Sequence, residues 1–133
     1  MIFTILGKPV PKQRPRFSKN HTYTPKKTMD YERYVKECYR VSNGLKMAGM
    51  IEITIDVYMK IPKSVKKSDC ELMLSNKKRP TKRPDLDNIG KSICDSLNGV
   101  AYDDDSQIVD MHIRKWYAID DYVIIDIKEV YNG

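Results

Sequence analysis

The chain has 133 residues, of which 41% are hydrophobic and 32% charged, and its formal net charge is +6. This size and composition predict one globular domain over residues 1–133 and exclude a disordered chain, and no apolar run approaches the roughly 18 residues of a membrane span. The apolar N-terminus lacks a preceding basic stretch and a cleavage site, so we expect a first strand rather than a signal peptide, and a cytoplasmic protein without membrane contact.

The N-terminal segment predicts a strand followed by a basic loop. Residues 1–6 have the length and composition of a strand. Residues 8–24 are rich in proline and in basic side chains, so we expect a long exposed loop. Its Lys12, Arg14 and Arg16 are candidates for binding DNA phosphates. The alternative is a solvated basic loop that has no partner.

A helix and a strand follow the loop. Thr24 and Pro25 are typical of a helix start, and apolar residues at spacings of three and four predict a helix that runs to about residue 42. Strict alternation of apolar and polar residues over residues 51–60 predicts a strand with one buried face.

The next segment, residues 61–84, is rich in lysine. We expect a partly mobile basic arm with one helical turn at residues 70–74. Lys82 and Arg83, at the end of the arm, are further candidates for DNA phosphate contacts. The arm leads directly into the most acidic part of the chain.

That acidic part combines a helix with an aspartate triplet. Apolar spacing predicts a helix over residues 85–97, with Asp85 as its cap and Asp87 in its first turn, and the triplet follows at residues 103–105. Carboxylates gathered without basic partners are typical ligands of one or two hard cations such as Mg²⁺. Lys91, one turn beyond Asp87, is placed either to contact a bound phosphate or to form a helical ion pair with Asp87.

The chain ends in two alternating segments, residues 109–114 and 123–128, which predict a β-hairpin. We therefore expect an α+β (mixed α/β) fold with a mixed sheet of about four strands and two main helices. The sequence has no glycine-rich loop for phosphates, which excludes P-loop and Rossmann folds.

Two other interpretations of the acidic region find little support. The run DLDNIG begins like a calcium-binding EF-hand loop, but Ile89 and Ser96 stand where ligands are required. Cys94 as a nucleophile has no nearby base. With Cys38 and Cys70 it forms no CxxC pair, which argues against a disulfide framework or a zinc ribbon.

Charge is distributed unevenly. Residues 1–40 carry 10 basic and 3 acidic side chains, residues 60–84 carry 9 and 2, and residues 85–133 carry 4 and 11. A polyanion-binding surface beside an anionic metal site would give this pattern. The alternative is that the basic and acidic segments pair with each other.

One resemblance is specific. The run RPDLDN, then Lys91, Asp95 and GVAYDDDSQIVD, resembles the RusA family of Holliday junction resolvases, most strongly over residues 83–110. The family pattern is Asp-x-Asp-Asn, a lysine four residues after the second aspartate, and a later Asp-Asp-x-Gln that leads into a strand. The resemblance implies that the metal-binding catalytic carboxylates are Asp85, Asp87 and Asp105, with Asp104 beside them and Lys91 as the catalytic lysine.

The resemblance also implies a small RusA-like nuclease domain that forms a homodimer, requires Mg²⁺, for which Mn²⁺ can substitute, and nicks two opposed strands of a four-way junction in DNA recombination and repair. The chain departs from the shorter founding type by its long basic N-terminal loop and by Asp103, so the metal ligand within the triplet stays open. The alternatives are a non-catalytic protein that binds branched DNA and a metal-dependent hydrolase of RNA or of small phosphate esters.

Overall fold

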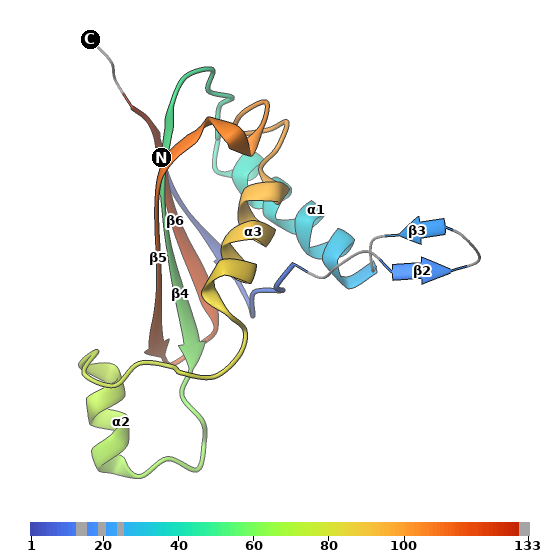
Figure 1. Ribbon diagram of the computed structural model, residues 1–133. Helices are drawn as coiled ribbons and strands as arrows, with labels where there is room; N and C mark the ends of the chain where they lie inside the picture. The colour runs from blue at the N-terminus through green and yellow to red at the C-terminus, as the bar shows by residue number, and fades with distance from the viewer. Residues whose placement is uncertain (13–15, 19–20, 24–25, 131–133) are drawn as a thin grey trace.

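A mixed four-stranded sheet organises the fold, which a computed structural model describes for residues 1–12, 16–18, 21–23 and 26–130 (Figure 1). The strand order is β1-β6-β4-β5. Strand β6 (Tyr122–Glu129) is antiparallel to both β1 (Ile2–Leu6) and β4 (Ile51–Lys60), whereas β5 (Ile108–Ala118) is parallel to β4. This sheet and its helices form a single small domain and confirm the predicted α+β fold class.

The predicted C-terminal hairpin is wrong, because β4 lies between β5 and β6. The short connection between β5 and β6 passes the carboxyl end of β4, where Asp121 Oδ1 accepts the backbone N–H of Lys60 at 2.9 Å. The physical reason lies in β4, whose alternate side chains from Ile51 to Val57 are all 0% exposed. A strand this apolar is stabilised most in the centre of a sheet, where both of its edges are hydrogen-bonded.

Helices α1 (Lys26–Val41) and α3 (Leu86–Ser96) cover one face of the sheet (Figure 1). Both bury the apolar stripe that the sequence predicts, including Tyr31 and Val35 of α1 and Ile89 and Ile93 of α3. The helix start predicted at Thr24 and Pro25 lies outside the described residues. Each described helix is too short or too polar to cross a membrane.

The basic arm is more ordered than the sequence suggests. It contains a helix of eight residues, α2 (Lys67–Leu74), instead of one turn. The guanidinium carbon of Arg79 lies 3.8 Å from the ring centroid of Trp116, and Arg79 Nε donates to the Lys115 carbonyl at 2.8 Å. Lys115 Nζ in turn donates to the Lys82 carbonyl at 2.8 Å. These contacts attach the arm to β5.

The N-terminal loop is also not wholly irregular. Within the predicted loop of residues 8–24, β2 (Arg16–Ser18) and β3 (His21–Tyr23) form an antiparallel pair. The sequence did not predict these strands, because proline residues lie on both sides of the segment and disfavour regular structure.

Candidate metal and DNA-binding site

The carboxylates of Asp85 and Asp87 lie at the exposed N-terminus of α3. Asp85 occupies the N-cap position with an extended backbone, but its side chain makes no capping hydrogen bond, contrary to the prediction. No ion pair joins either carboxylate to a basic side chain within the described part of the chain. Anions at a helix N-terminus are stabilised by the helix dipole. Both carboxylates are therefore available to a cation.

The aspartates of the triplet have three different environments. The Asp103 carboxylate pairs with Lys46 Nζ at 2.5 Å. The Ser106 side chain, together with its backbone N–H, which donates to Asp104 Oδ2 at 3.0 Å, holds the pKa of the Asp104 carboxyl below the usual range. Asp105 is half-buried in the short 3-10 helix η1 (Asp105–Gln107). Asp105 also faces a second carboxylate, which lies outside the triplet.

That second carboxylate is Asp95 of α3. Burial raises the pKa of Asp105, and the adjacent Asp95 carboxyl, which is within hydrogen-bonding reach, raises it further. Two such groups repel each other when both are ionised, and a shared proton or a cation relieves the repulsion. Sequence reasoning placed Asp95 on the flank of the helix without a role in the site. The sequence feature that could have identified Asp95 is its spacing of eight residues from Asp87, which places both side chains on the same face of the helix, two turns apart.

Asp95 is also the centre of a small ion-pair network. Lys12 Nζ lies 3.2 Å from Asp95 Oδ2 and 2.7 Å from Glu32 Oε1. Burial would lower the pKa of Lys12, but the two carboxylates raise it above its usual value. The Lys12 backbone N–H donates to the Asn88 carbonyl at 3.1 Å, which holds the segment after β1 against α3. The phosphate contact predicted for Lys12 would require its ammonium to leave one of these carboxylates.

Lys91 does not form the helical ion pair considered with Asp87. Its Nζ instead lies 3.8 Å from Asp95 Oδ2, and its side chain is 62% exposed. A long, exposed and weakly paired lysine can reach a ligand bound at the same helix face.

The predicted metal ligands do not form one tight group. Asp95 lies eight residues beyond Asp87, which corresponds to about 12 Å along a helix. Asp105 therefore meets α3 far from Asp85 and Asp87. Mg²⁺ is usually held by one or two carboxylates and keeps several waters, so oxygen ligands in this open arrangement fit a hydrated ion or two ions.

The group of three potential ligands that does come together in the described residues is Glu52, Asp110 and His112, with ligand atoms within 4.8 Å of one another. It lies on the sheet face opposite α1 and α3. Glu52 Oε2 is 3.8 Å from Lys128 Nζ, and His112 Nε2 is 3.3 Å from Asp110 Oδ1. Because these groups already partner one another, we assign no ion to them.

Gln107 fixes η1 relative to the sheet. Its Oε1 accepts the backbone N–H groups of Asp103 and Asp104 at 2.9 and 3.2 Å, and its Nε2 donates to the carbonyls of Met47 and Gly49 at 3.1 and 3.0 Å. With Asp104 it forms a capping box, whose spacing is visible in the sequence. Gln107 is thus a positioning residue for Asp105.

Cys94 does not act as a nucleophile. Its side chain is buried, and burial raises the pKa of the thiol to about 12, with smaller contributions from Asp105 and Asp95. The group remains a neutral thiol at physiological pH, whereas the thiolate is the nucleophile.

The remaining predicted DNA contacts are only partly described. Lys82 and Arg83 are exposed just before the N-terminus of α3. Arg14 lies outside the described residues, and for Arg16 the structure describes only the backbone, in β2.

Comparison with known proteins identifies the family. The family described as endodeoxyribonuclease RusA matches residues 7–128, a range that includes α3, η1 and every carboxylate discussed above. YqaN of Bacillus subtilis (strain 168), described as an uncharacterized protein, is 36% identical over 137 residues, which cover 96% of this chain and 95% of YqaN. The chain therefore belongs to the RusA family of endodeoxyribonucleases.

Proposed function

We propose that this protein is a Mg²⁺-dependent, structure-selective endodeoxyribonuclease of the cytoplasm that resolves Holliday junctions by paired hydrolytic nicks during DNA recombination and repair. The observation that carries the proposal is the contact between the carboxyl groups of Asp95 and Asp105, on two elements of the family-matched range. Asp95 already has two lysine neighbours, Lys12 and Lys91, and a divalent cation would relieve the repulsion between the two carboxylates that remains.

The proposed roles follow from the positions of the side chains. Asp85 and Asp87 would hold one metal ion, and Asp105, with Asp104 beside it, would hold a second. Mg²⁺, or Mn²⁺ in its place, supplies a bound water of lowered pKa and neutralises charge on the attacked phosphate. Lys91 would contact that phosphate from the next turn of α3. The phosphates on either side would be held by the basic residues of the N-terminal loop and of the arm, namely Lys12, Arg14, Arg16, Lys82 and Arg83.

We further propose that the protein acts as a homodimer. Two symmetric cuts across a four-way junction require two equivalent active sites, and a two-fold dimer supplies them. The exposed edge strand β5 supports this proposal, because its Val109 is 57% and its Met111 42% exposed. Apolar side chains on an open edge are a liability unless another chain covers them.

The test uses a labelled four-way junction, a linear duplex and RNA, each with Mg²⁺ or with a chelator. We expect paired nicks on the junction only with the metal. Asp87→Asn should lower the cleavage rate about a hundredfold or more while junction binding persists, because only the metal site is changed. Asp120→Asn, which removes an exposed aspartate in the turn between β5 and β6, is the matched control and should cut normally.

Two results would contradict the proposal. Junction binding without cleavage under Mg²⁺ and Mn²⁺ would favour the non-catalytic binding protein. Cleavage of RNA or of small phosphate esters without preference for junctions would favour a hydrolase of another phosphate ester.

A further inference from the structure

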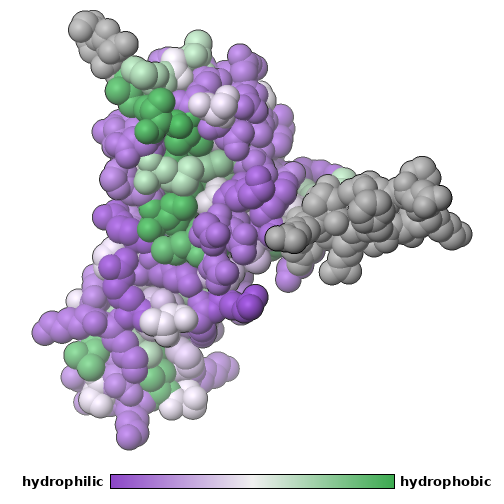
Figure 2. Space-filling view, in the orientation of Figure 1, coloured by the Kyte–Doolittle hydropathy of each residue, from purple (hydrophilic) through white to green (hydrophobic). Residues whose placement is uncertain are grey.

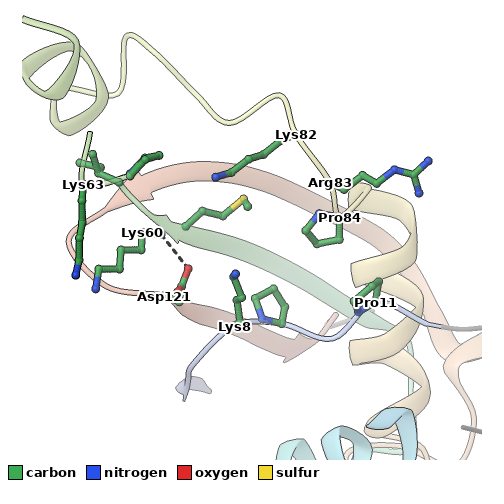
Figure 3. Close-up of a pocket in the computed structure, with 12 residues that line it drawn as sticks. Lys8, Pro11, Lys60, Lys63, Lys82, Arg83, Pro84 and Asp121 are labelled. Carbon is green, nitrogen blue, oxygen red and sulfur yellow. Dashed lines mark hydrogen bonds between the residues drawn. The ribbon is translucent and has the colours of Figure 1, made fainter. Parts of the chain in front are cut away.

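A pocket of about 590 Å³ lies beside the N-terminus of α3 (Figure 3). Its walls come from four segments distant in the chain: the residues after β1, the end of β4 with the residues that follow it, the residues that lead into α3, and Asp121 between β5 and β6. The volume falls in the range of sites that bind small organic groups, roughly 300–1,000 Å³. Neither the metal site nor the sequence patterns discussed above use this pocket as a whole.

The rim of the pocket is strongly basic. Five exposed cationic side chains line it, and none has an ion-pair partner among the described residues: Lys8, Lys60, Lys63, Lys82 and Arg83. The single carboxylate in the lining is Asp121, whose Oδ1 is occupied by the backbone N–H of Lys60. Five cations against one carboxylate in the lining would hold a phosphate.

The floor of the pocket is apolar. Pro9 and Met59 are buried, and Pro11, Ile61 and Pro84 are half-buried. A site that bound phosphate alone would not need an apolar floor. Pyrrolidine rings, a thioether and a branched alkyl side chain instead pack well against the face of an aromatic ring, and pockets for extruded nucleobases stack the base between apolar side chains.

The pocket is adjacent to the metal site through the backbone. Pro84 of the lining is followed directly by Asp85, the first predicted metal ligand. A DNA strand whose phosphate lies at the α3 N-terminus would thus bring a neighbouring nucleotide to the pocket.

We propose that the pocket binds one unpaired nucleotide of the DNA substrate, with its base on the apolar floor and its phosphate at the lysine rim. The proposal rests on DNA as the substrate of the proposed function. Removing a base from the stack costs a few kcal/mol in a duplex and least where the base has lost a neighbour. The pocket would therefore favour branch points over uninterrupted duplex, and it is a specificity-determining site rather than a catalytic one.

The experiment places 2-aminopurine at successive positions around the branch point of a four-way junction, because this base fluoresces more strongly when it leaves the stack. Ca²⁺ replaces Mg²⁺, so that binding is measured without the need for cleavage. We expect the full-length protein to raise the fluorescence at one position next to the branch point, and to leave uninterrupted duplex of the same sequence unchanged.

Two variants change the pocket in different ways. Ile61→Asn removes apolar contact without a change in charge and should abolish the fluorescence increase. The double variant Lys60→Gln/Lys63→Gln should weaken it. Both should lower the ratio of junction to duplex cleavage about tenfold, as expected for the loss of one base-stacking contact. Lys66→Gln/Lys67→Gln makes the same charge change on exposed residues outside the pocket and should leave the fluorescence and the ratio unchanged.

The outcomes separate the pocket from the catalytic proposal. Fluorescence that rises and depends on the pocket, in a protein that never cuts, would support the pocket and overturn the nuclease. Cleavage without a rise at any position, or a rise that persists in both pocket variants when circular dichroism shows them folded, would overturn the pocket. Displacement of the junction by free dAMP without any rise would assign the pocket to free nucleotides and would also overturn the proposal.

Discussion

At the scale of single residues, the aspartate triplet shows how neighbours of identical chemistry differ in function. Asp103 is neutralised by Lys46, and Asp104 caps η1 through the backbone of Ser106. Asp105 instead faces the Asp95 carboxyl. These contacts support Asp105 as the metal ligand of the three, on grounds independent of the family pattern.

Asp105→Asn should stabilise the metal-free protein at neutral pH. The folded protein raises the pKa of Asp105, so it binds the proton more tightly than the unfolded chain does, and stability falls as the pH rises through that pKa. Above that pKa the repulsion is present, so its removal should raise the free energy of unfolding by up to about 1 kcal/mol. The gain should shrink toward pH 3, where the wild-type carboxyl is protonated. Urea unfolding in chelator measures both values.

The same variant tests the metal. Added Mg²⁺ should stabilise the wild-type protein by mass action and should stabilise Asp105→Asn less. Asp103→Asn, which loses only the exposed Lys46 pair, is the control and should keep the response to Mg²⁺. An equal shift in Asp105→Asn and in the wild type would place the metal elsewhere.

At the scale of single residues, the sequence predicts only part of the site. Asp85, Asp87 and the triplet stand out because carboxylates without adjacent bases are rare in a basic chain. Asp95 and Lys12 did not stand out as partners, since 83 positions separate them and only the path of the segment after β1 along α3 brings them together. No spacing rule encodes such a contact.

At the scale of elements, the position of η1 depends on the side-chain amide of Gln107. Gln107 makes four hydrogen bonds that join the triplet to the residues before β4. Gln107→Glu keeps the shape of the side chain but replaces the NH₂ group, which donates to two carbonyls, by a carboxylate oxygen that can only accept. We expect a loss of about 1–2 kcal/mol in the free energy of unfolding, because two carbonyl acceptors, one of them partly buried, lose their donor.

Cleavage should fall in Gln107→Glu while junction binding is kept, since the change displaces Asp105 and leaves the basic surface intact. Single-turnover cleavage and a binding titration, both well below the melting temperature, measure this difference. Asp120→Asn, which changes an exposed side chain in the turn between β5 and β6, is the control and should cut normally. Normal cleavage by a destabilised Gln107→Glu would show that η1 has no positioning role.

The elements predicted well are those with a strong local period. Helices α1 and α3 and strand β4 were found with their ends within about two residues, because each buries one regular stripe. Helix α2 was reduced to a turn, since it buries only Met73 and so carries almost no stripe. The pairing of β5 and β6 was predicted wrongly, because the partner of a strand is decided by competition among all strands and local alternation does not report it.

At the scale of the whole molecule, the uneven charge has two causes. Some basic and acidic segments do pair, as Lys12 with Asp95 and Lys46 with Asp103 show. The lysines around the pocket beside α3 have no such partner among the described residues. The two explanations left open by the sequence therefore apply to different parts of the surface.

The edge strand gives a prediction for the assembly. Figure 2 shows apolar side chains gathered in a column over the sheet, flanked by hydrophilic ones. If a second copy covers the exposed apolar residues of β5, Val109→Lys should convert a dimer into a monomer and paired nicks into independent single nicks. Sedimentation and a supercoiled cruciform substrate measure the two effects.

Ile119→Lys is the matched control for the assembly, because Ile119 is 73% exposed in the turn after β5 and away from the edge. It should leave both mass and paired cutting unchanged. A wild-type protein that sediments as a monomer while making paired nicks would contradict the dimer.

The central place of β6 has a consequence for how the protein is made. This strand follows all others in the chain, yet it lies between β1 and β4 and pairs with both. At synthesis rates of about 5–20 residues per second, β1 and β4 leave the ribosome several seconds before β6 is complete. During that time their inner edges have no partner, and the face that supports α3 is not closed. The nascent chain therefore lacks the completed sheet against which α3 packs until β6 has been made.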